Sequence, residues 1–146
     1  MFKILKFAII FSIFLFLFFA YFHTISAITQ DLGRHLLTGK IILDTHQIPK
    51  TNLFSYTYPN FPFLNHHWGS EVIFYLIFKI FGFNGILVLT TLLILSSFLI
   101  IFSYAFKRSN IIGLSIVSLL YIRVLLERTD VRPEIFSFLF TECLLI

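Results

Sequence analysis

Charged residues are scarce in this chain, and the scarcity restricts its class. Only 12% of the 146 residues are Asp, Glu, Lys or Arg, whereas 58% are hydrophobic. A soluble globule of this composition would lack the polar side chains needed to cover its surface, so we exclude that class. The composition predicts an integral membrane protein, and the long uncharged runs favour an all-α, polytopic helical fold.

Cysteine and continuous basic runs are also lacking. The single cysteine, Cys143, cannot form a disulfide within one chain or a cysteine-based metal site. The formal net charge is +4, but the lysines and arginines are scattered and form no run that could grip a phosphate backbone. The sequence therefore argues against nucleic-acid binding.

Long apolar stretches predict three membrane spans and part of a fourth, and the third is shorter and carries Arg123 near one end. A helix needs about 20 apolar residues to cross the hydrocarbon core of a bilayer. The spans are expected near residues 7–28, 84–106, 111–126 and 135–146. A break between helical pieces is expected at Gly82–Gly85. Because the last stretch is too short to cross a bilayer, we interpret residues 1–146 as a single N-terminal transmembrane module of a larger protein.

Basic residues beside the predicted spans indicate their orientation. Lys3 and Lys6 flank the first span, and Lys107 and Arg108 flank the second, with no acid beside either pair. Such residues favour the cytoplasmic side, so the N-terminus is expected in the cytoplasm. Residues 29–82 then form a large outer loop with surface helices. A cleavable signal peptide is the alternative for the first span, but the run exceeds the usual length of about 7–15 residues, so an uncleaved helix is favoured.

The outer loop opens with a polar segment that is expected to form a surface helix. At helical spacing, one face carries Asp31, Arg34, His35 and Thr38, and another carries Leu32, Leu36 and Leu43. Asp31 could cap this helix, with its carboxylate accepting from backbone N–H groups and Arg34 as a counter-charge. It could also be a general base held just above the bilayer. The two roles do not exclude each other.

Two further features follow along the outer loop. Residues 48–62 contain three prolines, which is typical of an ordered, turn-rich loop that could cover a site. An apolar helix is then predicted over residues 72–81. Its polar stripe consists of His67, Glu71, Tyr75 and Lys79, which recur at four-residue spacing. We predict that this stripe faces the same cavity as Asp31.

The histidines beside this helix have two interpretations. No cofactor is certain, but His66, His67 and Glu71 could bind a divalent metal, because imidazole and carboxylate suit zinc or manganese. A third ligand would have to come from Asp31 or His35. The alternative is anchoring in the lipid headgroup region by aromatic residues, with the histidines merely solvated.

The second outer connection contains five charges between Glu127 and Glu134. Arg128 and Arg132 are suited to bidentate binding of a phosphate carried on a lipid. The alternative is an exposed salt-bridge cluster in which each pair contributes at most about 1 kcal/mol. Pro133 and Glu134 are expected in the first turn of the fourth helix, where both residue types are favoured.

The order of these elements is similar to the N-terminal part of a known family. The matching segments read Asp31-Leu-Gly-Arg-His35-Leu-Leu-Thr-Gly39, Pro49-Lys-Thr-Asn-Leu-Phe54-Ser55-Tyr-Thr57, His66-His67-Trp68 and Arg132-Pro133. Their succession resembles the multi-spanning C-type glycosyltransferases, including the dolichyl-phosphate-mannose protein mannosyltransferase-like and aminoarabinose-transferase-like proteins of bacterial envelopes. The resemblance covers essentially the whole chain.

The resemblance implies transfer of a sugar from a polyprenyl-phosphate donor to an acceptor on the extracytoplasmic side of a bacterial cell membrane. Asp31 would be the catalytic base, and two arginines would stabilise the departing lipid phosphate. His67 stands where an acid is often found in the family, so that acidic role would pass to Glu71 or be absent. The residues expected to bind substrate are Arg34, His35, His66, His67, Glu71, Arg128 and Arg132. Family members have many more spans, so this module alone is not expected to be active.

Two other classes fit the same sequence. In a transporter or flippase, the same Asp and Arg would bind substrate without chemistry. In a membrane-anchored structural protein, the loop that carries His, Trp and Glu would have no site role. The partners expected for the enzyme are membrane lipid and the lipid-linked sugar donor.

Overall fold

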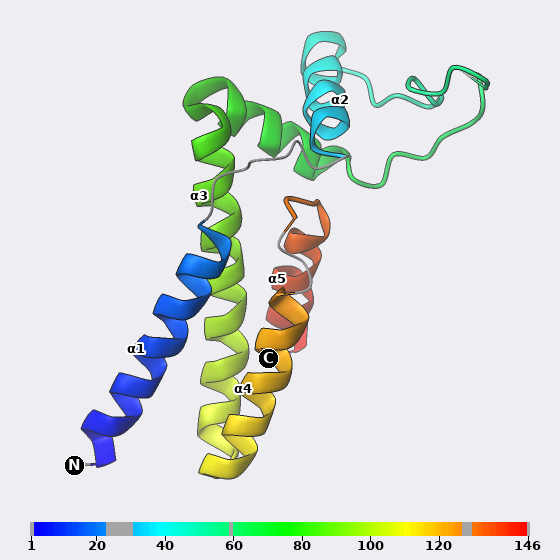
Figure 1. The fold of residues 1–146 in the computed structure, drawn as a ribbon. Coiled ribbons are helices and arrows are strands. Elements are labelled where there is room, and N and C mark those ends of the chain that lie inside the picture. The colour runs from blue at the N-terminus through cyan, green and yellow to red at the C-terminus, as the bar shows by residue number, and fades with distance from the viewer. Residues whose placement is uncertain (1, 23–30, 59, 127–129, 146) are drawn as a thin grey trace. The chain divides into compact units, whose positions relative to one another are not determined.

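The computed structural model describes residues 2–22, 31–58, 60–126 and 130–145 (Figure 1). The five helices are α1 (Phe2–Tyr21), α2 (Leu32–Thr45), α3 (Trp68–Arg108), α4 (Ile111–Leu126) and α5 (Glu134–Leu145). No strand forms within the described residues, so the predicted all-α fold is confirmed. Within the described residues, Pro49, Pro62 and Pro133 all lie outside the helices, as expected for a residue that lacks a backbone N–H.

The chain divides into two compact units, and the division falls inside α3. The loop unit is Ile25–Ile86, which contains α2, the beginning of α3 and the connection between them. The helical unit is Met1–Thr24 together with Leu87–Ile146, which contains α1, the rest of α3, α4 and α5. Each unit has buried residues of its own.

Apolar side chains from all four helices build the core of the helical unit. Its buried members are Leu17, Ile94, Phe98, Phe102, Ala105, Leu114, Leu125 and Ile135. The Phe14 ring packs edge-on against Phe98 at a centroid distance of 5.8 Å, and Phe102 lies 5.6 Å from the same ring. Aromatic pairs of this kind add to the burial that holds α1 against α3.

A kink divides α3 at Gly82, whose φ and ψ are 65° and −159°. Residues with a side chain rarely adopt a positive φ, so glycine suits this position. The predicted break near Gly82–Gly85 is confirmed. The 41 residues of α3 therefore consist of two helical pieces that meet at this kink, as expected.

α3 is the one helix among the described residues that is long and apolar enough to cross a membrane. α4 has the bounds predicted for the third span, and α5 begins one residue before the predicted fourth. α1 begins at Phe2, earlier than predicted, and ends at Tyr21. Residues 23–28 of the predicted first span lie outside the described part. The structure therefore supports one full-length candidate span, and insertion of several spans stays a prediction.

In the loop unit, Gly39 allows α2 to pack closely against the first turns of α3. A Cβ added to Gly39 would overlap the carbonyl oxygen of Glu71 and would lie 2.9 Å from Cβ of Tyr75. No larger residue fits there unless the two backbones move apart. His35 lies one turn before Gly39 on the same face of α2, so this close approach also carries His35 to α3.

Candidate active site

Asp31 stands immediately before α2, but its side chain does not cap the helix. Its φ of −101° and ψ of −21° are helical, whereas a capping residue usually has an extended backbone. The carboxylate makes no capping hydrogen bond, and the helix begins instead with the His35 N–H donating to the Asp31 carbonyl at 3.0 Å. The interpretation of Asp31 as a side-chain cap is therefore wrong.

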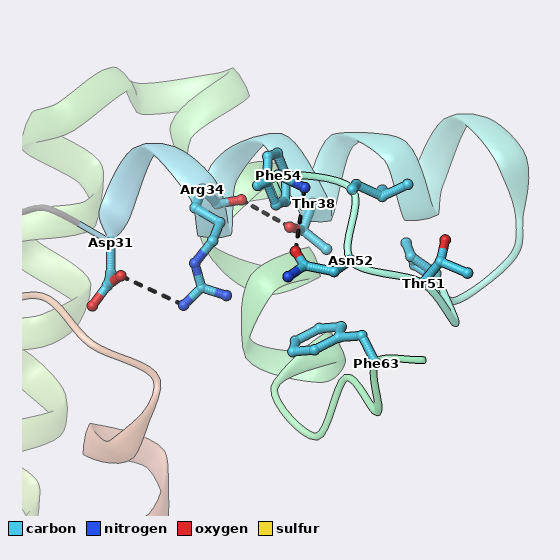
Figure 2. A pocket seen from close by; sticks show the side chains of 9 residues that line it. Asp31, Arg34, Thr38, Thr51, Asn52, Phe54 and Phe63 are labelled. Atoms are coloured by element: carbon cyan, nitrogen blue, oxygen red, sulfur yellow. Dashed lines mark hydrogen bonds and ion pairs between the residues drawn. The ribbon is translucent and has the colours of Figure 1, made fainter. Parts of the chain in front are cut away.

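The carboxylate of Asp31 pairs with Arg34, as predicted. Arg34 Nη2 lies 3.6 Å from Asp31 Oδ1, and the two side chains are 35% and 45% exposed (Figure 2). An ion pair with this exposure contributes at most about 1 kcal/mol to stability. The contact places a positive charge beside the carboxylate while leaving its oxygens accessible to another partner.

Asp31, Arg34 and Thr38 line a pocket with a volume of about 350 Å³. Figure 2 shows the rest of its lining, which comes from the connection after α2 and consists of Pro49, Thr51, Asn52, Leu53, Phe54 and Phe63. The volume falls in the range of about 300–1,000 Å³ that small-molecule sites occupy. The pocket combines a carboxylate and a guanidinium with two aromatic rings and several hydrogen-bonding groups.

The loop that completes the pocket is closed by two backbone hydrogen bonds. The Asn52 N–H donates to the Phe61 carbonyl at 3.0 Å, and the Phe63 N–H donates to the Lys50 carbonyl at 2.8 Å. At the far end of the loop Tyr56 is fully exposed. The predicted turn-rich loop is therefore confirmed, and its residues line the same pocket as Asp31.

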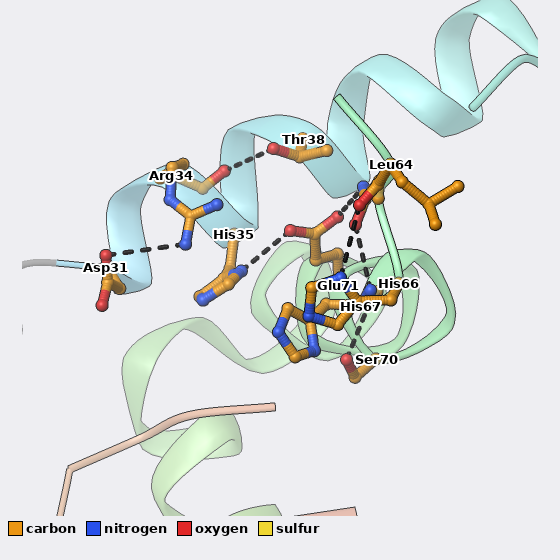
Figure 3. A network of polar contacts seen from close by, with 10 residues as sticks. Asp31, Arg34, His35, Thr38, Leu64, His66, His67, Ser70 and Glu71 are labelled. Carbon is orange, nitrogen blue, oxygen red and sulfur yellow. Dashed lines mark hydrogen bonds and ion pairs between the residues drawn. The ribbon is translucent and has the colours of Figure 1, made fainter. Parts of the chain in front are cut away.

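His35 and Glu71 meet in the interior of the loop unit although they are 36 residues apart in sequence (Figure 3). His35 Nδ1 lies 2.8 Å from Glu71 Oε1, and the two side chains are 3% and 1% exposed. Glu71 Oε2 accepts from Asn65 Nδ2 at 2.6 Å. Whether the imidazole is neutral or charged, an Nδ1–H can donate to the carboxylate. Both oxygens of Glu71 are thus occupied by side chains of this unit.

The burial of Glu71 changes the interpretation of the polar stripe on α3. Glu71 is buried, Tyr75 is partly buried and Lys79 is exposed, and none of the three lines the Asp31 pocket. The prediction that the stripe faces the same cavity as Asp31 is wrong, because the close approach at Gly39 places α2 over Glu71. The pair of His35 and Glu71 joins α2 to α3, and any contact of either residue with substrate stays a prediction.

His66 and His67 belong to the turn that begins α3. Their rings lie 4.0 Å apart, and the His67 ring meets that of His35 edge-on at 5.9 Å. Asn65 Oδ1 accepts from the His67 N–H at 3.0 Å, and Ser70 Oγ donates to the His67 carbonyl at 2.8 Å. In the described part of the chain no three His, Cys, Asp or Glu side chains are grouped to hold a metal ion. The ligand set predicted for a divalent metal is therefore not assembled there.

The two arginines predicted to bind a lipid phosphate belong to the connection before α5. Arg132 is part of the helical unit, where its Nη2 lies 3.5 Å from Asp130 Oδ2 and both side chains are exposed. Arg128 lies outside the described residues. Glu134 stands in the first turn of α5 as predicted, but the prediction that Pro133 lies in the same turn is wrong, because the helix begins at Glu134. Phosphate binding by Arg128 and Arg132 stays a prediction.

Comparison with known proteins assigns no family. No family model, curated protein or solved structure matches the chain. The case for a function thus depends on the geometry of the pocket and on the resemblance of the sequence motifs.

Sequence reasoning missed several residues that make important contacts in the structure. Asn65 was overlooked, although a residue that favours turns directly before a helix is a recognisable signal. Gly39 was overlooked as a packing residue. Glu142 was overlooked as well, and the signal there was a single acid within the last apolar stretch of the sequence.

Proposed function

We propose that this chain forms the acceptor side of an integral-membrane glycosyltransferase of the C type. In this proposal the enzyme moves a sugar from a polyprenyl-phosphate donor to an acceptor outside the cytoplasm. The observation that carries the proposal is the position of the Asp31 carboxylate. It makes no capping hydrogen bond, and it lines a pocket together with Arg34. The motif resemblance identifies the same residue as the base.

The proposed reaction uses Asp31 as a general base. A hydroxyl or amine of the acceptor enters the pocket and donates a hydrogen bond to the carboxylate. As the acceptor atom forms its bond to the anomeric carbon, Asp31 takes the proton, and the bond from that carbon to the phosphate oxygen breaks. The lipid phosphate leaves with the electron pair. A base acts in this way when it lies within about 2.6–3.2 Å of the proton donor, which an accessible carboxylate allows.

Other pocket residues have supporting roles in this proposal. Arg34 keeps a positive charge beside the Asp31 carboxylate. Phe54 and Phe63 offer aromatic faces to the apolar face of a sugar ring, and Asn52 and Thr51 offer hydrogen-bonding groups to its hydroxyls. Arg128 and Arg132 would stabilise the departing phosphate.

We predict that the loop unit lies outside the cytoplasm and that the end of α3 lies inside it. Of these two regions, only the end of α3 carries paired basic residues without acids, namely Lys107 and Arg108. Single cysteines at Tyr56, which is fully exposed, and at Ser109 would be introduced into a Cys143→Ser background. An impermeant maleimide on intact cells should label position 56 and should reach position 109 only after permeabilisation. Labelling of position 109 alone would overturn the topology.

The lipid-linked nature of the donor gives a direct test of the proposed activity. Membranes that contain the protein are expected to transfer radiolabelled sugar from a polyprenyl-phosphate carrier to endogenous acceptors, and not directly from a nucleotide sugar. The control is the same membrane without the protein. Transfer from the nucleotide sugar with the lipid pool depleted would contradict the proposed donor, and vectorial uptake of the intact lipid without transfer would indicate a flippase.

A further inference from the structure

A groove follows the last turns of α3, and the proposed sugar transfer does not use it. Its volume is about 460 Å³, within the range of about 300–1,000 Å³ that small-molecule sites occupy. None of its described lining residues is buried, and all of them belong to the helical unit. These residues are Leu99, Ile100, Ser103, Tyr104, Lys107 and Arg108. Their spacing of three and four residues places them on one face of α3.

The polarity of the groove changes along the helix axis. Leu99 and Ile100 form an apolar end, and Lys107 and Arg108 form a basic end in the last turn of α3. Lys107 follows Leu99 by eight positions, which corresponds to about 12 Å along a helix. α3 is the candidate membrane span, so the apolar end is expected at the depth of the acyl chains and the basic end beside the lipid headgroups.

No acid neutralises the basic end of the groove. The sequence contains no Asp or Glu between Glu71 and Glu127. Within the part of the chain that the structure describes, neither Lys107 nor Arg108 forms an ion pair. Two adjacent cations without counter-charges attract an anion, and the nearest anions to the end of a membrane span are the phosphates of acidic lipids.

An aromatic ring positions one of the two cations. The guanidinium carbon of Arg108 lies 4.0 Å from the centroid of the Tyr104 ring, one turn earlier on the helix. This cation–π contact provides no oxygen acceptor, so the N–H groups of Arg108 remain available for bidentate hydrogen bonds to a phosphate. Basic residues in a last turn also offset the helix dipole, but that role requires neither the ring nor an adjoining apolar groove.

We propose that this groove binds an anionic phospholipid. Lys107 and Arg108 bind the phosphate, the Ser103 hydroxyl donates to the headgroup, and an acyl chain lies along Leu99 and Ile100. The order of basic and apolar contacts matches the order of headgroup and chain in a phospholipid, whereas a soluble phosphate would leave the apolar end unused. The site depends on membrane insertion of α3 and not on sugar transfer, because none of its residues lines the proposed acceptor pocket.

Native mass spectrometry of the full chain in detergent tests the preference for an anionic lipid. Titration with phosphatidylglycerol and with phosphatidylcholine would give the Kd of the first bound molecule of each, and phosphatidylglycerol should bind more tightly. Lys107→Gln and Arg108→Gln should each raise the Kd for phosphatidylglycerol by about fivefold, the effect of one basic residue near a membrane surface. Equal Kd values for the two lipids with the unmutated chain would overturn the proposal.

Variants that keep the net charge separate a specific site from general attraction to cations. Lys107→Ser combined with Ser109→Lys moves one charge out of the groove, since Ser109 does not line it. This variant should bind phosphatidylglycerol as weakly as Lys107→Gln does. Tyr104→Leu should also weaken binding, whereas Tyr104→Phe keeps the ring and should bind like the parent. Parent affinity in the relocated-charge variant would show that net charge alone attracts the lipid, and the groove would not be the site.

A photoreactive phosphatidylglycerol would locate the acyl chain. With a diazirine on the chain, the lipid should crosslink to the peptide that contains Leu99 and Ile100, and mass spectrometry would identify the modified residues. Soluble glycerol 3-phosphate at the same concentration should not reduce this crosslinking, because it has no chain to occupy the apolar end. Crosslinks confined to other segments, or loss of crosslinking with glycerol 3-phosphate, would refute binding of a phospholipid in this groove.

Discussion

Replacement of Glu71 with Ala is expected to destabilise the loop unit by about 3–5 kcal/mol, the usual cost of removing one partner from a buried ionisable pair. Glu71 is 1% exposed, and its two oxygens accept from His35 and Asn65. The Ala variant leaves the donors of both partners buried without an acceptor, which is the costly outcome. Hydrogen exchange of the α2 amides in detergent would report the loss of the local contact.

Matched variants separate this role from substrate binding. Lys79→Ala removes an exposed charge from the same helix and should change stability by less than about 0.5 kcal/mol. His35→Ala combined with Glu71→Ala should cost less than the sum of the two single changes, because both remove the same contact. If Glu71→Ala instead leaves exchange of α2 unchanged and abolishes sugar transfer, Glu71 belongs to the substrate site and the structural role is refuted.

The helices of this chain were predictable because apolar runs and breakers have local signatures. The bounds of α4 follow from an apolar run that contains one charge, Arg123, and ends before Glu127, and the kink in α3 follows from Gly82. Pro49 and Pro62 indicated the non-helical connection between α2 and α3. Such signals depend on a few neighbouring residues, so a single sequence contains them.

The contacts of the site were less predictable because they join distant segments. Helical spacing placed Asp31 and His35 on one face of α2, but only the packing at Gly39 determines that His35 enters the interior while Asp31 stays half-exposed. A stripe at four-residue spacing does not reveal which of its residues another helix will cover. Glu71 is buried and Lys79 is exposed, although both lie on that stripe.

The same limitation explains the capping error at Asp31. An Asp directly before an apolar helical run is a frequent cap, and the residue type alone does not specify its backbone conformation. A helical φ and ψ carry the carboxylate away from the first-turn N–H groups and toward Arg34. Residue type therefore predicted the position of Asp31 correctly and its hydrogen bonding incorrectly. Its accessibility makes a catalytic role testable apart from a role in folding.

Replacement of Asp31 with Asn is expected to lower the rate of sugar transfer by about a hundredfold or more, which is the usual contribution of a general base. The amide has nearly the shape of the carboxylate but cannot take the acceptor proton at neutral pH. A hundredfold loss corresponds to about 2.7 kcal/mol of transition-state stabilisation. The rate would be measured in membranes with a radiolabelled polyprenyl-phosphate sugar as donor.

Stability should change little in the same variant. Asp31 makes no capping hydrogen bond, and its exposed contact with Arg34 contributes at most about 1 kcal/mol, so both Asp31→Asn and Asp31→Ala should fold. Asp44→Asn is the matched control, because Asp44 is an exposed acid on the same helix that lines no part of the pocket. It should transfer sugar at the rate of the parent. Normal transfer by Asp31→Asn would remove the general base from the mechanism, whereas a slow but fully folded Asn variant beside an active Asp44→Asn would assign the chemistry to this carboxylate.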